Sequence, residues 1–169
     1  PVFGLDGKVT FLVPEGRDIT ERKKILEEIK DSEAAYRALY DSSKDAVMIV
    51  VPEKGFIAGN PSTIEMFKCR NEAEFITKSP ADLSPELQPD AVSSTVKAQE
   101  MMQIAMEKGS HFFEWTHKRL DGQEFFATVL LTRVELKGEP VLQATVRDIT
   151  EQKLAEAELK KRLDALERF

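Results

Sequence analysis

The stretch Val146-Arg147-Asp148-Ile149-Thr150-Glu151-Gln152-Lys153 joins an apolar, β-like run to a charged run of helical character. Asp148 is placed to accept a hydrogen bond from a backbone N–H of the following helix, and Glu151, three residues later, can complete a capping box. A strand that becomes a helix within a few residues can pass a strand movement on to that helix. We therefore predict a signal-relay site formed by Arg147, Asp148, Ile149, Thr150 and Glu151. A plain helix start without a signalling role is the alternative.

The same motif occurs a second time, as Arg17-Asp18-Ile19-Thr20-Glu21. Each copy follows a β-like run and precedes a charged helical pattern, so the repeat indicates tandem domains of one kind. On this interpretation, residues 1–17 are the last hairpin of an upstream domain, with its turn at Asp6-Gly7. We expect the chain, which begins with proline, to be a piece of a longer protein. A chance match of five residues is the alternative.

Two helical patterns flank a central domain at residues 43–149. In residues 18–42, apolar residues recur with the seam spacing of a coiled coil, although Asp31-Ser32 could cap a second helix, so we expect a break near Lys30–Ser32. In residues 150–169, three leucines and Phe169 share one face. A helix of about 20 residues is marginal alone in water, which favours a homodimer formed through the flanking helices; packing against the chain's own domain is the alternative. The predicted dimer seam consists of Ile25, Ile29, Tyr36, Leu39, Leu159, Leu163 and Leu166.

Composition narrows the class of protein. The 169 residues carry a net charge of −6, which resides mainly in residues 41–149, and no long basic run is present, so we exclude a nucleic-acid partner. The single cysteine, Cys69, cannot form an internal disulfide or a cysteine-based zinc site. No apolar run approaches the roughly 20 residues that span a bilayer, and no signal peptide is visible, so we expect a cytoplasmic location and no membrane span in this chain.

The central residues predict an α+β domain with the element order β-β-α-α-α-β-β-β. A meander of the last three strands is expected to join the first two strands in one antiparallel sheet. A helix start at Asn60-Pro61-Ser62 and a helix stop at Gly109 frame the helical part. The predicted strands are 45–51, 55–60, 111–118, 124–136 and 140–146, and the predicted helices begin at 61, 71 and 93.

This order, together with four local motifs, resembles a PAS sensory domain over residues 41–149. The resemblance implies a five-stranded antiparallel sheet with helices on one face, a pocket between them, and amphipathic flanking helices that dimerise and relay signals. It also implies a bacterial multidomain sensor with adjacent PAS domains and a histidine kinase or diguanylate cyclase as output domain; we expect the present chain not to be an enzyme. The motifs are Asp41-Ser42-Ser43-Lys44-Asp45-Ala46, Gly59-Asn60-Pro61-Ser62, Glu114-Trp115 with Arg119-Leu120-Asp121-Gly122, and Arg147-Asp148-Ile149-Thr150.

A small-molecule ligand would bind between the sheet and the helices, where methionine suits an adaptable cavity. Asn60 could orient a polar group of the ligand or merely cap the helix that follows. Phe112 and Phe113 lie on opposite faces of their strand, so the sequence leaves open which face looks inward. The predicted lining residues are Met48, Ile57, Asn60, Met66, Phe67, Phe75, Met102, Met106, Phe113, Trp115 and Leu130.

The cofactor stays unknown from the sequence, and we expect none to be tightly bound. Haem-binding PAS domains use a histidine on the long helix, and residues 93–108 contain none, which disfavours haem. Phe67-Lys68-Cys69-Arg70 does not match the cysteine motif of light-sensing flavin members, although Trp115 and several phenylalanines could stack on a noncovalent flavin. His111 and His117 share one strand face but lie too far apart for one metal ion, so we interpret them as ordinary surface or cross-strand histidines.

Three functions remain open at this point. The first is a sensory module in which a small molecule alters the pocket and the exit helix. The second is a ligand-free dimerisation and relay module that passes a signal from an upstream domain to the output domain. The third is a redox sensor with a noncovalent flavin.

Overall fold

A computed structural model describes residues 2–11 and 16–167, without the side chains of Val2 and Phe11. Two units are distinguished, residues 1–38 and residues 39–169. The predicted strand residues Leu12 and Val13 and the helix residue Phe169 lie outside the described residues.

The first unit contains the predicted N-terminal hairpin, formed by β1 (Val2–Phe3) and β2 (Val9–Phe11) in antiparallel pairing. Gly7 supports the turn with a φ of 73°, a conformation that glycine adopts without strain. The Asp6 carboxylate accepts a hydrogen bond from the Lys8 backbone N–H at 3.1 Å. The assignment of this hairpin to an upstream domain stays a prediction.

Helix α1 (Thr20–Ser42) is continuous, so the predicted break near Lys30–Ser32 was wrong. Serine or aspartate inside a helix costs only about 0.5 kcal/mol relative to alanine, which is less than the loss of the backbone hydrogen bonds that a break would interrupt. An ion pair between Arg37 and Glu33, at 3.4 Å, adds i,i+4 support just beyond the predicted break. At the start of the helix, the Asp18 carboxylate accepts the capping hydrogen bond from the Thr20 N–H at 2.9 Å.

The second unit is built on a five-stranded antiparallel sheet, which confirms the predicted α+β class. The order across the sheet is β4-β3-β7-β6-β5, so the C-terminal meander lies beside the first strand of the domain, with Ala46 opposite Val146. This pairing brings the exit of the domain next to its entry. The strands are β3 (Ala46–Val51), β4 (Gly55–Gly59), β5 (Ser110–Lys118), β6 (Glu124–Leu136) and β7 (Glu139–Asp148).

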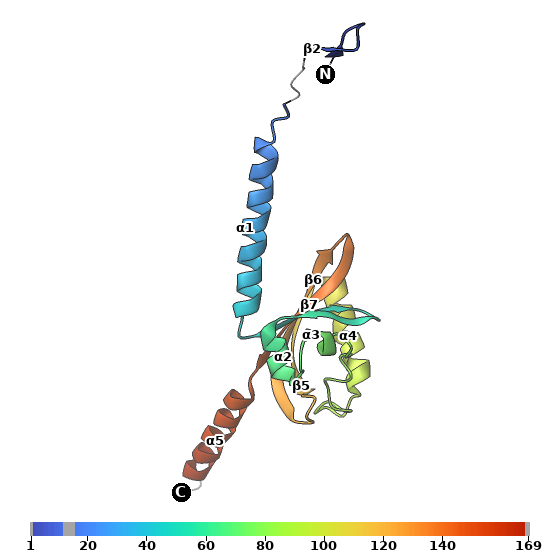
Figure 1. The fold of residues 1–169 in the computed structure, drawn as a ribbon. Helices are drawn as coiled ribbons and strands as arrows, with labels where there is room; N and C mark the ends of the chain where they lie inside the picture. The colour runs from blue at the N-terminus through green and yellow to red at the C-terminus, as the bar shows by residue number, and fades with distance from the viewer. Residues whose placement is uncertain (1, 12–15, 168–169) are drawn as a thin grey trace. The chain divides into compact units, whose positions relative to one another are not determined.

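The chain between β4 and β5 carries three helices, of which α4 lies against one face of the sheet (Figure 1). Asn60 and Asn71 cap the first two helices by accepting hydrogen bonds from backbone N–H groups of the first turn. Gly109, with a φ of 92°, ends the third helix as predicted. These helices are α2 (Pro61–Phe67), α3 (Glu72–Phe75) and α4 (Ser94–Lys108); α5 (Thr150–Glu167) follows β7.

The core lies between the sheet and these helices. The two-residue period of the strands directs Phe125, Ala127 and their neighbours at odd positions of β6 inward, while Phe67 and Phe75 enter from α2 and α3. Gly59 permits this packing, since a Cβ atom there would lie 2.9 Å from the Phe75 ring. Burial of each large apolar side chain contributes about 1.5–3 kcal/mol, so the core accounts for much of the stability of the unit.

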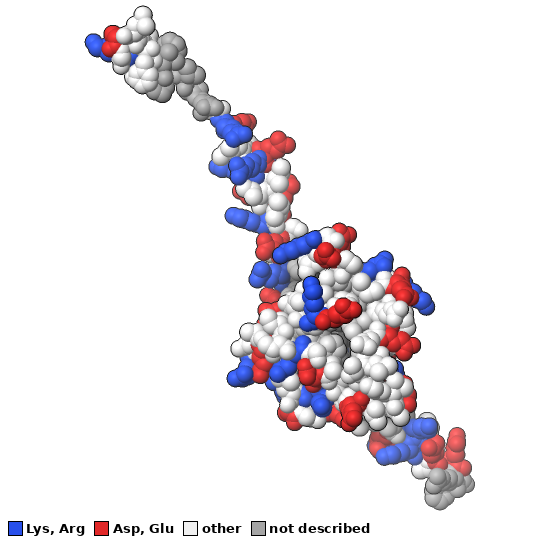
Figure 2. Space-filling view, turned by 90° about the vertical axis from the view of Figure 1, so that its right-hand side faces the viewer, with Lys and Arg blue, Asp and Glu red and all other residues white. Residues whose placement is uncertain are grey.

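The surface shows no preference for one sign of charge on the face that Figure 2 presents, where acidic and basic side chains are interspersed. Over the described ranges of the chain, no helix has both the length and the apolar character needed to cross a membrane.

Candidate functional site

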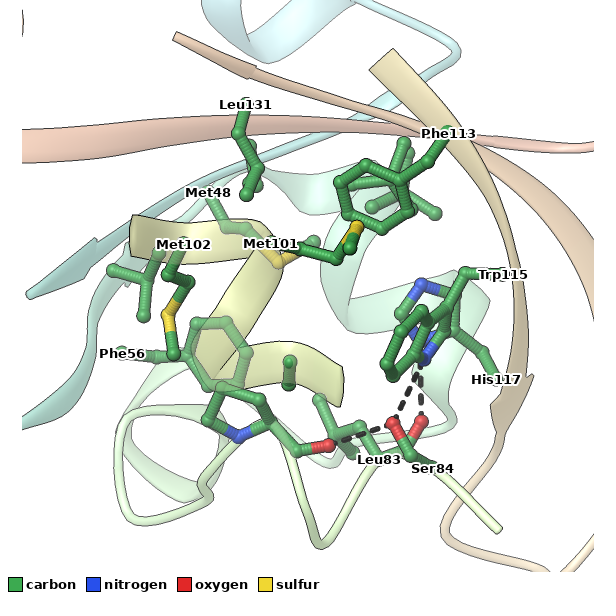
Figure 3. Close-up of a pocket in the computed structure, with 16 residues that line it drawn as sticks. Met48, Phe56, Leu83, Ser84, Met101, Met102, Phe113, Trp115, His117 and Leu131 are labelled. Atoms are coloured by element: carbon green, nitrogen blue, oxygen red, sulfur yellow. Dashed lines mark hydrogen bonds between the residues drawn. The ribbon is translucent and has the colours of Figure 1, made fainter. Parts of the chain in front are cut away.

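An apolar cavity of about 60 Å³ lies between the sheet and α4 (Figure 3). The rings of Trp115 and His117 lie beside each other on one side of it, and Met48, Met102 and Phe56 lie on the other. Strands β3 to β7, α4 and the loop before α4 all contribute to the wall. The lining residues are Met48, Val50, Phe56, Pro80, Leu83, Ser84, Ala98, Met101, Met102, Phe113, Trp115, His117, Val129, Leu131, Ala144 and Val146.

The structure brings four of the predicted pocket residues together around this cavity, namely Met48, Met102, Phe113 and Trp115. Four others lie close by without lining it. Phe67 and Phe75 are fully buried core residues, Met66 packs against the core, and Met106 lines a neighbouring open cleft. The cleft shares Val50, Pro80, Ala98 and Met102 with the cavity, so the two spaces adjoin each other.

Two residues that were predicted to line the pocket are exposed instead, so their assignment to the pocket was wrong. Leu130 is 40% exposed and pairs with Phe112 on the outer face of the sheet, because inward positions of β6 are the odd-numbered ones. Ile57 is 43% exposed, and a register shift in the pairing of β3 with β4 lets Phe56 point inward in its place. The strand alternation was visible in the sequence, but the choice of face required the sheet.

The Asn60 side chain forms hydrogen bonds mainly with backbone groups and does not line the cavity. Its side chain is fully buried. The amide nitrogen donates to the Tyr40 and Asp45 carbonyls at 3.0 and 3.1 Å. The amide oxygen accepts from the Val47 N–H at 3.0 Å and from the Thr63 N–H and hydroxyl at 3.0 and 2.8 Å. Asn60 therefore joins the end of α1, the start of β3 and the start of α2.

The polar atoms of Trp115 and Ser84 in the cavity wall are already paired with the protein. The Trp115 Nε1–H donates to the Ser84 hydroxyl oxygen at 3.0 Å, and the Ser84 hydroxyl donates to the Pro80 carbonyl at 2.8 Å. Figure 3 shows this chain of bonds at the lower edge of the cavity. Neither side chain has a hydrogen left to donate to a ligand.

His117 differs from these residues. Its Nδ1 lies 3.1 Å from the Leu83 carbonyl oxygen, and since a carbonyl only accepts, Nδ1 carries the hydrogen. Nε2 is then an acceptor; it is shielded from solvent and has no hydrogen-bond partner among the residues that the structure describes. Burial lowers the pKa of His117 to about 4, against the opposing effects of the Leu83 carbonyl and the Asp148 carboxylate. The imidazole is therefore neutral at pH 7.

Of the two interpretations offered for His117, the cross-strand one is confirmed, since His117 lies opposite Phe125 on β6, and the surface one was wrong. The residue follows Phe113 and Trp115 at the two-residue period of β5, and that period was the available signal for an inward side chain. Its ring stacks on Phe125 with centroids 5.5 Å apart and meets the Phe67 ring edge-on at 5.2 Å.

Arg119 connects this aromatic cluster to the end of the domain. Its guanidinium lies 4.0 Å above the centroid of the Phe125 ring. It also donates hydrogen bonds to the Met66 carbonyl, in the last turn of α2, and to the Asp148 carboxylate, the latter at 2.8 Å. Only 13% of the Arg119 side chain is exposed, so this ion pair is less screened by solvent than a surface pair.

Asp148 makes the helix-capping bond that the motif predicts, by accepting from the Thr150 N–H at 2.9 Å. Partial burial raises the pKa of Asp148, but the hydrogen bonds from Thr150 and Arg119 outweigh it and hold the pKa below its usual value. No bond from Glu151 back to Asp148 occurs in the described part of the chain, so the capping box is incomplete there.

The remaining residues of the exit motif bind neighbouring strands. The Thr150 hydroxyl oxygen accepts from the Phe126 N–H at 3.2 Å, and the Ile149 N–H donates to the Phe126 carbonyl at 2.9 Å. Arg147 forms a bidentate ion pair with Asp45 at 2.7 and 3.0 Å. The first residues of α5 are thus fixed to β6, whereas Arg147 joins the exit to the entry of the domain.

The predicted dimer-seam residues are exposed within this chain, with values from 50% to 73%. Helix α5 contains no buried residue over its described length. Dimerisation itself stays a prediction. The exposed seam residues are Ile25, Ile29, Tyr36, Leu39, Leu159, Leu163 and Leu166.

Comparison with known proteins agrees with this geometry. No curated protein matches the sequence. Among solved structures, the PAS domain of an HTR-like protein from Haloarcula marismortui has a TM-score of 0.62 and 20% identity, covering 76% of this chain and 100% of that one. A PAS domain from a two-component sensor histidine kinase has a TM-score of 0.57 and 16% identity, covering 72% and 98%. An RNA-binding light-oxygen-voltage receptor has a TM-score of 0.58 and 15% identity, covering 93% and 40%.

These identities are low, so the likeness to solved structures shows the fold alone. The sequence profile of the PAS domain matches residues 44–151, which is more than half of the chain. The match begins before β3 and ends at the exit motif, so it spans the sheet, the three helices and the cavity between them. The chain therefore belongs to the PAS domain family.

Proposed function

We propose that the chain is a sensory and relay module in which occupancy of the internal cavity alters the exit helix α5. The main support for this proposal is the position of Arg119. It contacts the Phe125 ring, which stacks on His117, and it binds the carboxylate of Asp148, which caps α5. A change at the cavity wall that moves His117 or Phe125 would therefore change the Arg119–Asp148 pair.

The cavity wall favours a sensory role over a purely structural one. A relay domain without a ligand would fill the space between sheet and helices, since interiors are close-packed. Here about 60 Å³ stays open, in a wall that includes the His117 side chain. A ligand-free relay remains the second candidate, supported by the direct ties of Thr150 and Ile149 to β6.

The volume of the cavity argues against a flavin as its resident. A cavity of about 150 Å³ is known to bind benzene, and the present one has less than half of that volume. A tricyclic flavin ring would require the wall to move apart extensively. No group of three potential metal-ligating side chains occurs in the parts of the chain that the structure describes.

The output domain belongs to our proposal as well: a histidine kinase or a diguanylate cyclase in the same protein, receiving the signal through α5. The similarity to a PAS domain from a two-component sensor histidine kinase supports the first of these. The exit helix has the charged, exposed character of a segment that acquires its partner outside this domain.

Xenon filling of the cavity tests the sensory proposal, because xenon binds apolar cavities without needing a polar partner. We expect xenon pressure to change amide hydrogen exchange in the first turn of α5 severalfold in the unmodified chain. Asp148→Asn should abolish this response, since it keeps an acceptor for the Thr150 N–H but removes the charge that pairs with Arg119. Exchange can be followed by NMR, residue by residue.

Arg133→Gln provides the matched control for that experiment. Arg133 also donates to a carbonyl of a helix, that of Met106 in α4, but has no ion pair with the exit motif. This variant should keep the response of α5 to xenon. Xenon binding that leaves α5 exchange unchanged in the unmodified chain would exclude the proposed coupling.

Dimerisation through the flanking helices is a separate part of the proposal. Leu163→Glu places a charge on the predicted seam of α5, and we expect it to convert a dimer into a monomer at micromolar concentration in sedimentation. Ala157→Glu adds the same charge on the opposite face of the helix and should leave the dimer intact. A monomer in the unmodified chain at that concentration would refute the dimer.

A further inference from the structure

An open polar cleft of about 430 Å³ lies where the exit motif meets α2 and the turn between β5 and β6. None of its lining residues also lines the internal cavity, so it is a separate space that the proposed sensory function does not use. Its wall includes Lys44, Glu65, Met66, Lys68, Arg119 and Asp148.

Two ammonium groups of this wall have no partner in the described part of the chain. Lys44 and Lys68 are exposed, and neither side chain forms a hydrogen bond or an ion pair with another described residue. The Glu65 carboxylate is likewise free there, whereas Asp148 binds Arg119. The unpaired groups thus leave an excess of one positive charge, although the chain as a whole carries −6. A locally positive cleft in an acidic chain favours an anionic ligand.

Lys68 occupies a backbone position that is unfavourable for lysine. The residue ends α2 with a φ of 59° and a ψ of 36°, in the left-handed region. Glycine adopts this conformation without strain, whereas a residue with a Cβ atom adopts it at a cost in stability. A lysine at this position therefore supplies what glycine cannot, an ammonium group at the edge of the cleft.

Arg119 connects the cleft to the cap of α5. Three of its five N–H groups are bonded, to the Gln123 side-chain oxygen at 3.1 Å, to the Met66 carbonyl and to the Asp148 carboxylate. One hydrogen on each terminal nitrogen has no partner among the described residues. An anion that binds these hydrogens would compete for the guanidinium with Asp148, which caps α5.

We infer that this cleft binds a small phosphate monoester, whose phosphate group contacts Lys44, Lys68 and Arg119 and weakens the Arg119–Asp148 pair. The inference goes beyond the proposed sensory function, because it adds a second input to α5 that does not pass through the internal cavity. The two share only the link from Arg119 to Asp148.

The donors of the cleft suit phosphate better than a carboxylate. Lysine binds as a point charge with rotatable donors, and a phosphate group offers three oxygens that accept from several directions. A planar carboxylate is bound best by a bidentate guanidinium, but Arg119 already uses donors on Gln123 and Asp148.

The size of the cleft leaves room for an organic part. Its volume corresponds to roughly fourteen water molecules at 30 Å³ each, which is more than a phosphate group alone would fill. The partly buried Met66 side chain supplies an apolar surface beside the charged groups. We therefore assign the ligand to the phosphate monoesters with a few carbon atoms.

Glycerol 3-phosphate tests the inference, with sodium chloride at equal ionic strength as the reference. We expect saturable shifts of the Lys44 and Lys68 amide resonances, with a Kd of about 1 mM at low ionic strength. Hydrogen exchange in the first turn of α5 should rise severalfold. Absence of saturable binding would overturn the inference.

Two further probes distinguish the source of the phosphate group. Inorganic phosphate should bind more weakly than the ester, because it leaves Met66 uncovered, and equal affinities would overturn the assignment of an organic part. Phosphatidylcholine vesicles that contain phosphatidic acid should not sediment the chain. Sedimentation with these vesicles, without binding of glycerol 3-phosphate, would overturn the assignment to a soluble ester.

Substitutions of charged residues test the position of the site. Lys44→Gln and Lys68→Gln should each weaken binding about fivefold, the upper value for an exposed charge pair, and Glu65→Gln should strengthen it by a similar factor. Lys54→Gln is the matched control, because Lys54 is exposed, lies outside the cleft and changes the net charge equally. Equal losses in Lys54→Gln and Lys68→Gln would show that net charge binds the ligand, and the inference would fail.

The outcome for α5 separates this inference from the proposed sensory function. A response of α5 to glycerol 3-phosphate without a response to xenon would support the cleft and refute the coupling of the internal cavity. Saturable binding of glycerol 3-phosphate with unchanged exchange in α5 would refute the competition with Asp148.

Discussion

Asn60→Ala is expected to destabilise the PAS unit by about 4 kcal/mol, close to the upper end of single substitutions. The side chain is fully buried and makes five hydrogen bonds, to Tyr40, Asp45, Val47 and twice to Thr63. Alanine would leave carbonyl and N–H groups from three segments without partners in the interior. Urea unfolding followed by circular dichroism measures the change.

Asn60→Asp sharpens this experiment. Aspartate is as good a helix cap as asparagine, so a residue that only capped α2 would tolerate the change. At position 60 the carboxylate would lose both donated bonds and would face the Tyr40 and Asp45 carbonyls, so we expect a loss of stability similar to that of Asn60→Ala.

Asn71 is the matched control, because it caps α3 in the same way but is exposed. Its side chain accepts from the Glu74 N–H at 2.9 Å and, unlike that of Asn60, joins no distant segments of the described chain. We expect Asn71→Ala to cost about 1 kcal/mol and Asn71→Asp to cost less than that. Equal losses at positions 60 and 71 would contradict the role of Asn60 as a tertiary junction.

Acidification from pH 6.5 to 4 is expected to cost the PAS unit roughly 3 kcal/mol through His117 alone. Burial lowers the pKa of His117 from 6.5 to about 4 in the folded chain, whereas the unfolded chain takes up the proton near pH 6.5. The unfolded state therefore binds more protons between these two values, and stability falls as the pH falls. Above pH 6.5 and below pH 4 this group adds no further dependence.

Urea unfolding at a series of pH values tests this prediction, and His117→Asn should flatten the slope above pH 5. Between pH 4 and 5 the carboxylates with lowered pKa, Asp148 and Asp82 among them, begin to contribute in the same direction. His111→Asn removes the other histidine, beside Met101, and should leave the slope in place. A slope above pH 5 that survives His117→Asn would show that another group carries it.

The sequence predicted much of the candidate site in outline. The apolar face of α4 and the aromatic alternation of β5 were enough to assign Met102, Phe113 and Trp115 to a pocket, and the Asp148 motif predicted a helix cap. His117 could have been included by the same two-residue period, but it was left as a surface or cross-strand histidine because its polarity was given more weight than its position.

The errors have a common physical origin. Leu130 and Ile57 are apolar residues in strands, and composition alone cannot say which face of a sheet is covered. The break in α1 followed from local capping propensity, which is worth less than an uninterrupted ladder of backbone hydrogen bonds. In each case a local sequence pattern was outweighed by a longer-range interaction. For the strands this was the packing of one sheet face, and for α1 it was the continuous series of helical hydrogen bonds.

Local sequence patterns were sufficient to predict the element order, the strand-to-helix exit motif and the resemblance to a PAS domain, because these depend on the periodicity of apolar residues and on capping residues near in the chain. The folded chain was needed to learn that Arg119 binds Asp148 across 29 residues, that Asn60 joins three segments, and that Nε2 of His117 is buried without a hydrogen-bond partner among the described residues. Those features arise where residues distant in sequence meet in a closely packed interior, and pairing there depends on distances and directions that no local pattern encodes.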